Sequence, residues 1–198
     1  MQLRLNKLIL ALILTVCWLG AGMAQAAEFS AVVFTRADSR ESQGKVYLQG
    51  EKLRREFPSG EGMTITIARP DKKVMWLFRP GQKTYMEIPF DKSDLGQTME
   101  LPKDSAKMKL LGTETVNGYE TEKYETTVTG QGKTAKHYMW VAKKLGLPIK
   151  IVSVDGKFFM EYRQIKEGGV PDGLFEIPPG YQKMALPQGP PPGTPRKK

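Results

Sequence analysis

The sequence predicts a mainly β protein built around one antiparallel sheet. Segments rich in Val, Ile, Thr, Tyr and Phe recur at intervals of roughly ten residues, as consecutive short strands do. Turn-forming residues separate the segments, and there are too many of them for a flat sheet in a small domain, so we expect the sheet to curl or close. The eleven expected strands are Phe29–Arg36, Gly44–Gln49, Lys52–Phe57, Met63–Arg69, Lys73–Phe78, Lys83–Ile88, Lys109–Thr115, Tyr119–Thr129, Thr134–Ala142, Ile149–Val154 and Lys157–Lys166.

The turns between these strands favour a meander. Asn117-Gly118 and Asp155-Gly156 are dipeptides that two-residue hairpin turns prefer. In Arg79–Gln82, Pro80-Gly81 predicts a type II turn, because Pro presets the first torsion and Gly accepts the positive one. Short connections of this kind join antiparallel neighbours, so strands adjacent in sequence are expected to pair.

One segment interrupts the strand pattern with a predicted helix. In Phe90–Lys107, acidic and hydroxyl side chains that include Asp91 precede Leu95 and Met99, and Pro102 follows. Cap residues ahead of apolar ones, with a proline at the end, are typical of a short helix.

The first 26 residues predict export. Arg4 and Lys7 precede an apolar run from Leu8 to Leu19, and Ala24-Gln25-Ala26 supplies the small residues of a signal-peptidase site. The run is shorter than the roughly 20 residues of a comfortable membrane span. We expect residues 1–26 to be a cleaved signal peptide and the mature protein to begin at Ala27 in the periplasm, with a retained N-terminal anchor as the alternative.

Cys17 is the single cysteine and allows a second form of export. A lipoprotein signal also places a cysteine after an apolar run, so an outer-membrane lipoprotein anchored through Cys17 is the alternative to a periplasmic protein, although Val16 fits that signal poorly. If Cys17 leaves with the signal peptide, the mature chain has no thiol for a disulfide, a metal site or catalysis.

The remaining residues suit one domain and a tail. Residues 27–185 are enough for a single buried core, and a monomer is expected. Residues 186–198 are rich in Pro and Gly and end in a basic run, which predicts a disordered tail. The formal net charge is +9, but basic and acidic residues are interspersed, which favours a solvated surface and argues against a nucleic-acid partner.

The sequence argues against catalysis and against a resident cofactor. His137 is the single histidine, so a histidine-based metal centre cannot form, and a strand position explains it. Neither a Gly-x-Ser-x-Gly motif nor a phosphate-binding glycine loop occurs. Glu120 and Glu122 share one face of a strand, where solvated charges are commoner than an acid–base pair.

The apolar residues exceed what one small core needs. Met63, Ile65 and Ile67 share a strand face, and Val74–Phe78 is apolar on both faces. Either these residues fill an ordinary core or some of them line an interior for a ligand. The candidate lining residues are Met63, Ile65, Ile67, Trp76, Phe78, Met139 and Phe159.

The order of several motifs resembles LolA-like periplasmic proteins. The resemblance covers about 28–184, is closest to a branch of uncharacterised LolA-like domains, and departs from the carrier itself at Asp71-Lys72-Lys73, where the carrier has Asp-Gly-Lys. The motifs are the strand–turn–strand segment Arg69–Tyr85, the strands Gly118–Tyr124 and Met139–Lys150, and Leu174–Tyr181 near the end.

This resemblance implies an unclosed β-barrel with short helices packed in its mouth around an apolar cavity. The cavity of the lipoprotein carrier holds acyl chains, and relatives bind other lipids or sense envelope stress. An early-strand arginine of the carrier is important for its lid, so Arg54 or Arg55 is the candidate here, with a surface arginine as the alternative. Phe90–Lys107, with Leu95 and Met99, is then expected to be a mobile lid over the opening.

Two functions follow from the resemblance and the residues. The first is a carrier or sensor that binds a lipid or a lipoprotein acyl chain, with an envelope protein as a further partner and transient contact with a membrane surface. The second is a non-catalytic structural or protein-interaction module of the envelope, with a filled core and no ligand.

Overall fold

The structure, a computed structural model, describes residues 27–60, 62–98, 108–130 and 133–185, and these residues form one twelve-stranded sheet. Its order is β12-β6-β5-β4-β3-β2-β1-β11-β10-β9-β8-β7. The strands are β1 (Glu28–Ala37), β2 (Arg40–Gln49), β3 (Lys52–Ser59), β4 (Gly62–Arg69), β5 (Val74–Arg79), β6 (Thr84–Pro89), β7 (Lys109–Val116), β8 (Tyr119–Gly130), β9 (Lys133–Ala142), β10 (Leu147–Ser153), β11 (Phe158–Glu167) and β12 (Gln182–Met184).

The sheet joins two antiparallel meanders, β1 to β6 and β7 to β11. Strand β1 pairs antiparallel with β11 and so connects the two. All eleven predicted strands are confirmed. The twelfth, β12, was not predicted, because it has only three residues and pairs parallel with β6.

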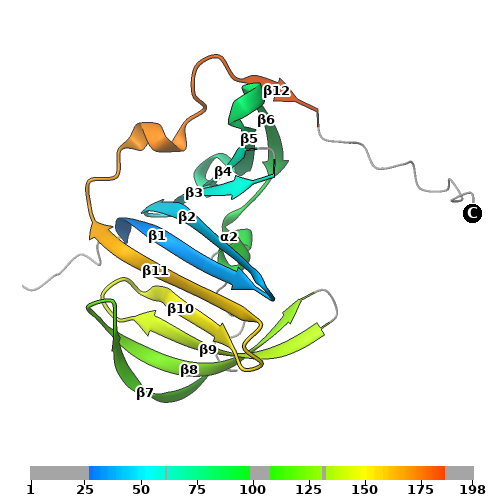
Figure 1. Cartoon of the computed structure of the whole chain (residues 1–198). Helices are drawn as coiled ribbons and strands as arrows, with labels where there is room; N and C mark the ends of the chain where they lie inside the picture. The colour runs from blue at the N-terminus through cyan, green and yellow to red at the C-terminus, as the bar shows by residue number, and fades with distance from the viewer. Residues whose placement is uncertain (1–26, 61, 99–107, 131–132, 186–198) are drawn as a thin grey trace, which may run out of the picture.

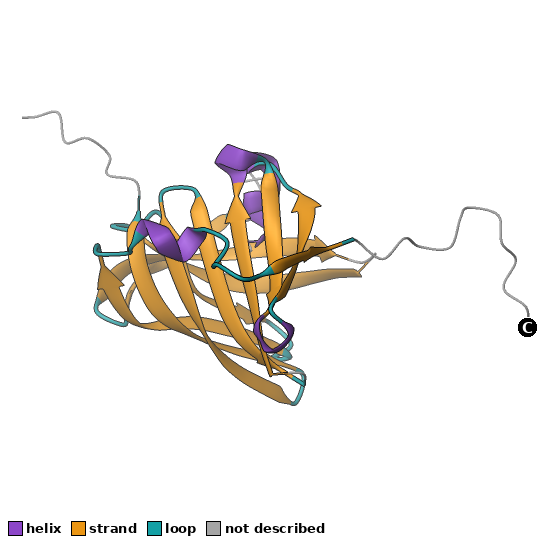
Figure 2. Cartoon of the chain, turned by 90° about the horizontal axis from the view of Figure 1, so that it is seen from above, coloured by secondary structure: helices purple, strands orange, loops and turns teal. Residues whose placement is uncertain are grey.

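The sheet curves strongly without closing (Figures 1 and 2), as expected for an unclosed β-barrel. Strands β7 and β12 are its two edges. The predicted helix is confirmed as α2 (Lys92–Thr98), which lies between the two halves of the curved sheet in Figure 1. We call the face toward α2 the inner face and the opposite one the outer face.

The observed turns agree only in part with the turns predicted from the sequence. Asn117 and Gly118 both have positive φ, as a two-residue hairpin turn requires, so this prediction is confirmed. The connection at Asp155-Gly156 is longer than two residues, because β10 ends at Ser153 and β11 begins at Phe158. The type II turn is wrong: Pro80–Gln82 forms a 3-10 helix (η2), and the left-handed residue is Lys83 with φ 49°.

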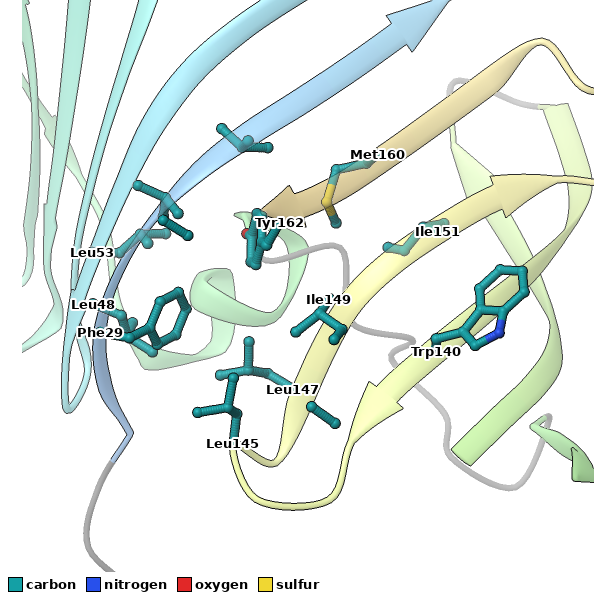
Figure 3. Packing of buried hydrophobic residues seen from close by; sticks show 14 of the residues in the cluster. Phe29, Leu48, Leu53, Trp140, Leu145, Leu147, Ile149, Ile151, Met160 and Tyr162 are labelled. Carbon is teal, nitrogen blue, oxygen red and sulfur yellow. The ribbon is translucent and has the colours of Figure 1, made fainter. Parts of the chain in front are cut away.

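The main core lies on the inner face and joins both halves of the sheet. Phe29 of β1 and Tyr162 of β11 are completely or almost completely buried, with ring centroids 6.0 Å apart. Figure 3 shows them beside Leu48, Leu53 and Ile149, with Trp140 apart from the group. Leu95 of α2 packs against this core, and so does Phe90, which lies just before the helix.

Several predictions concern residues outside the described part. These are the signal peptide of residues 1–26, the tail of residues 186–198 and the lid residues beyond Thr98, including Met99. The domain bounds of 27–185 stay a prediction. Within the described residues, no helix is both long enough and apolar enough to span a bilayer.

The inner core should carry much of the stability. Leu48→Ala removes a side chain that is 2% exposed, so we expect a loss of about 2–5 kcal/mol in the free energy of unfolding. Lys45→Ala, at an exposed site on the same strand, should change it by less than about 0.5 kcal/mol. Urea unfolding measures both, and equal midpoints for the two variants would contradict this placement of the core.

Candidate functional site

The inner face of β3 to β6 carries a half-buried apolar surface. Directly paired residues share a sheet face. Ala68 pairs with Met75, which pairs with Ile88, and in the next row Thr66 pairs with Leu77, which pairs with Met86. The four large side chains among them, Met75, Leu77, Met86 and Ile88, are half-buried, unlike the completely buried residues of the main core.

Phe57 extends this surface toward β2. Gly44 lies beside it on β2, and the Phe57 ring is so close that a Cβ at Gly44 would come within 2.8 Å of it. Gly44 therefore lets the half-buried ring lie flat against the sheet. The result is a continuous apolar surface from β2 to β6 on the inner side.

Helix α2 covers part of this inner face and is fixed mainly at its start. Asp91 accepts a hydrogen bond from the Ser93 N–H at 2.7 Å, and the Asp91 N–H donates to the Asp94 carboxylate at 3.0 Å. These reciprocal bonds satisfy free N–H groups at the start of the helix. The bonds from Ser93 lower the pKa of Asp91, because they stabilise the charged carboxylate.

The inner face of β9 to β11 is filled. Met139 of β9 is completely buried and pairs with Ile151 of β10, which pairs with Met160 of β11. On the neighbouring β8, the Tyr124 hydroxyl donates to Glu122 at 2.6 Å, which raises the pKa of Tyr124. Apart from Leu110 on the edge strand β7, the accessible apolar surface of the inner face therefore belongs to β2 to β6.

The outer face of the same strands is covered by the C-terminal segment, residues 168–185. Phe175 of the 3-10 helix η4 (Asp172–Phe175) is completely buried, and Val170 nearly so, in a second core with residues of β4 and β5. The Tyr181 ring meets the Phe78 ring edge-on at 5.3 Å between centroids. Figure 1 shows this segment in orange, running from β11 to β12 beside β6.

Two buried arginines attach the C-terminal segment to the sheet. Arg54 of β3 donates to the Leu174 carbonyl at 2.8 Å and to Glu56 at 2.7 Å. Arg69 of β4 donates to the next carbonyl, that of Phe175, at 2.9 Å. Since the segment has little regular structure of its own, these bonds satisfy backbone groups that strands would satisfy elsewhere.

Arg69 also forms the strongest ion-pair network in the described part of the chain. Its guanidinium binds Asp71 through two bonds of 2.8 and 2.6 Å and Glu176 at 2.6 Å. The bonds to Asp71 and Glu176 raise the pKa of Arg69, and that from Arg69 lowers the pKa of Asp71. Hydrogen bonds from Lys72 and then from Arg69 lower the pKa of Glu176.

The predicted lining residues lie on both faces rather than around one space. Ile67, Trp76 and Phe78 belong to the second core under the C-terminal segment, Ile65 packs against it, and Met63, on the same strand face, is 44% exposed. Their common face was therefore read correctly from the sequence, but it is the outer face. Met139 alone lies in the inner core.

Phe159 lies in a separate hollow on the outer face. The hollow, with a volume of about 560 Å³, is lined by β1, β2 and β11. The Arg36 guanidinium stands 5.9 Å from the centre of the Phe159 ring, and that of Arg163 stands 4.3 Å from Phe34. Two arginine–aromatic pairs thus line this open hollow.

The predicted lid residues also lie on different faces of the sheet. Arg54 points to the outer face and holds the C-terminal segment, whereas its neighbour Arg55 pairs with Val46 and Thr66 on the inner face. Leu95 packs against the inner core, and Met99 lies outside the described residues. The roles of these residues in gating stay predictions.

Each residue considered for catalysis has another interaction partner. Glu120 forms an ion pair with Lys143, whereas Glu122 accepts from Tyr124. The His137 ring lies edge-on to Phe158, with centroids 6.0 Å apart. Among the residues that the structure describes, no group of three or more His, Cys, Asp or Glu side chains could hold a metal ion.

Sequence reasoning missed Arg69 and the role of the C-terminal segment. The available signal was the alternation of Leu174-Phe175-Glu176-Ile177, in which apolar residues flank an acid that can pair with a base. It was not used, because the segment lacks the length and β-branched residues of a strand.

A family model described as "Domain of unknown function (DUF4412)" matches residues 32–147, from β1 into β10. The chain belongs to the DUF4412 family. The match includes α2 and the inner surface of β2 to β6, while the C-terminal segment lies beyond it. A comparison of this DUF4412 chain with curated proteins gives no match.

Two solved structures share the fold of this DUF4412 chain. An uncharacterized conserved protein from Thermus thermophilus is 16% identical with a TM-score of 0.57, over 81% of this chain and 91% of that one. MucB, in the MucA/MucB complex of Pseudomonas aeruginosa, is 11% identical with a TM-score of 0.51, over 85% of this chain and 63% of that one, so the chain spans less than two thirds of MucB. The predicted LolA-like fold is confirmed.

The Arg69 contacts should stabilise the attachment of the C-terminal segment to the outer face. Arg69→Met leaves the buried Phe175 carbonyl without its donor, so we expect a loss of about 2 kcal/mol in the free energy of unfolding. Lys72→Met removes only an exposed ion pair to Glu176 and should cost less than about 1 kcal/mol. Urea unfolding measures both, and faster proteolysis between 168 and 185 in Arg69→Met alone would locate the effect. Equal losses of stability in the two variants would contradict this role of Arg69.

Acid should release the same segment. The pKa values of Asp71 and Glu176 are lowered in the folded protein, so their stabilisation is complete above the unfolded values of about 4 and is lost as the pH falls through the folded values. In a Trp140→Phe background, fluorescence of the covered Trp76 should report solvent exposure in this range. Glu176→Gln should reduce the pH dependence, and an unchanged acid transition in that variant would contradict the assignment.

Proposed function

We propose that this chain binds an apolar ligand, a lipid or a lipoprotein acyl chain, on the inner face of its open sheet, as a carrier or sensor of the cell envelope. The observation that supports this most is the half-buried apolar surface of Phe57, Met75, Leu77, Met86 and Ile88. A filled structural core would bury such side chains, as strands β9 to β11 do. Carriers with this fold hold ligands in a comparable place.

The affinity expected of this surface for an acyl chain suits a carrier. Burying a methylene contributes roughly 0.8 kcal/mol, so about ten carbons contribute roughly 8 kcal/mol before association costs. A micromolar dissociation constant corresponds to about 8 kcal/mol, so additional contacts must offset those costs. An affinity of this order is strong enough to load a ligand and weak enough to release it.

Helix α2 is the proposed movable cover of the site. It has seven residues, its described apolar contact with the core comes from Leu95, with Phe90 just before it, and Lys92 pairs with the exposed Glu51. Few buried contacts make local opening cheap compared with global unfolding. The ligand would then enter beneath α2 while the C-terminal segment stays attached to the outer face.

We infer that the protein works in the periplasm without catalysing a reaction. The composition of residues 1–26 supports export, with Cys17 as the attachment point in the alternative lipoprotein form. N-terminal sequencing of protein from the envelope fraction should give Ala27. Incorporation of a labelled fatty acid at Cys17 would contradict the periplasmic form.

A protein-interaction module is the second candidate function. The MucB structure is that of a complex with MucA, so this fold accepts a protein partner in at least one case. In this chain the edge strand β7 exposes Leu110 and Leu111, at 54% and 44%, where another strand could pair. In this alternative the inner face takes up no lipid.

Apolar ligand binding should depend on the inner face. Leu77→Glu places a charge in the proposed site and should reduce uptake of a neutral fluorescent apolar probe at least tenfold, since a buried charge without a partner is costly. Met63→Glu makes the same kind of change on the outer face and should leave uptake unchanged. Circular dichroism and urea unfolding check that both variants fold.

The natural ligand is identified by extracting the purified protein with organic solvent and analysing the extract by mass spectrometry. We expect a lipid in stoichiometric amount. A wild-type protein that carries no lipid and takes up no apolar probe would contradict the ligand-binding function and leave the interaction module.

A further inference from the structure

Arg55 is a half-buried cation within the apolar inner surface. Its side chain lies on that face because Arg55 pairs with the buried Val46 on one side and with Thr66 on the other. Within the described residues, Arg55 has no hydrogen bond, ion pair or aromatic ring contact. The adjacent Arg54 donates to Glu56 and to the Leu174 carbonyl, so the two arginines differ in their bonding.

Two hydroxyl groups lie beside Arg55 on the same face. Thr66 is its direct pairing partner, and Thr64, two residues away on β4, pairs with Phe57. Both are half-buried, and neither side chain forms a hydrogen bond in the part of the chain that the structure describes. Arg55, Thr64 and Thr66 thus form a small polar group bordered by Phe57 and Leu77.

A guanidinium that has no partner among the described residues has a chemical consequence for the ligand. In the unliganded protein, water can bind its five donors. An acyl chain laid on the surrounding apolar surface would exclude that water and leave the charge without acceptors, which is costly. A ligand that brings its own anion avoids this cost, and a guanidinium matches a carboxylate or a phosphate in two-point geometry.

We propose that the ligand is an amphiphile with an anionic head group, and that Arg55 binds this head group while the acyl chain lies along Leu77, Met75 and Met86. The proposal rests on the proposed function and adds the charge of the ligand to it. Thr64 and Thr66 supply further hydrogen bonds to the head-group oxygens. A fatty acid carboxylate and a phospholipid phosphate present the same chemistry to this site.

The test compares ligands that share a chain and differ in charge. Protein stripped of lipid on a hydrophobic resin is loaded with a neutral fluorescent apolar probe, which is then displaced by palmitate, hexadecanol or palmitoyl lysophosphatidylglycerol below their micelle concentrations. We expect the anions to displace the probe at about tenfold lower concentration than hexadecanol, as a charge-assisted hydrogen bond allows. Stronger displacement by palmitate would indicate a carboxylate ligand, and by the lysophospholipid a phosphate ligand.

Variants assign the preference to Arg55. Arg55→Met should remove the preference for anions while probe and hexadecanol binding change less than about threefold, and Arg55→Lys should keep part of it. Arg40→Met, at an exposed site with the same loss of charge, should keep all of it. Probe binding by Arg55→Met shows in the same experiment that the variant is folded.

Each negative result would overturn a different claim. Equal displacement by palmitate and hexadecanol would overturn the head-group proposal and leave apolar ligand binding in place. A preference for anions that survives in Arg55→Met would overturn the role of Arg55. Wild-type protein that does not bind the probe would overturn the proposed function itself.

Discussion

Strand β5 is apolar on both faces and β4 extends its apolar outer face, so the architecture depends on how each face is kept from water. Ile67 and Trp76 point outward, while Ala68 and Met75, their neighbours in sequence, point inward. An open sheet cannot bury both faces against itself. The C-terminal segment covers the outer face, so the inner face is left to α2 and to whatever else binds there.

The two covers are attached by different forces, which suits different roles. The C-terminal segment is fixed by a completely buried Phe175 and by Arg54 and Arg69, whose bonds reach backbone carbonyls. Helix α2 has a described apolar contact through Leu95, and Phe90 just before it adds another. One side of the sheet is therefore closed firmly, and the other is covered by a short helix with few anchors.

Residue type and turns predicted the strands, and the resemblance predicted the unclosed barrel, but alternation along the strands did not predict the site. It showed that Ile65 and Ile67 share a face, which the register confirms, yet a period of two is symmetrical and cannot tell which face will be covered by which segment. For the same reason the sequence offered Arg54 or Arg55 as a single lid candidate, whereas in the structure Arg54 lies on the outer face and Arg55 on the inner face. The cover itself could not be predicted, because η4 and β12 are too short to have a periodic pattern.

The placement of the ligand on the inner face is tested most directly by the methionine side chains. In protein labelled with ¹³C at the methionine methyl groups, a bound fatty acid should shift the signals of Met75 and Met86, which lie on the inner face of β5 and β6. The signals of Met63 and Met184, which are exposed at 44% and 41%, should stay in place. Shifts confined to Met63 and Met184, or no shift at saturating ligand, would contradict the account.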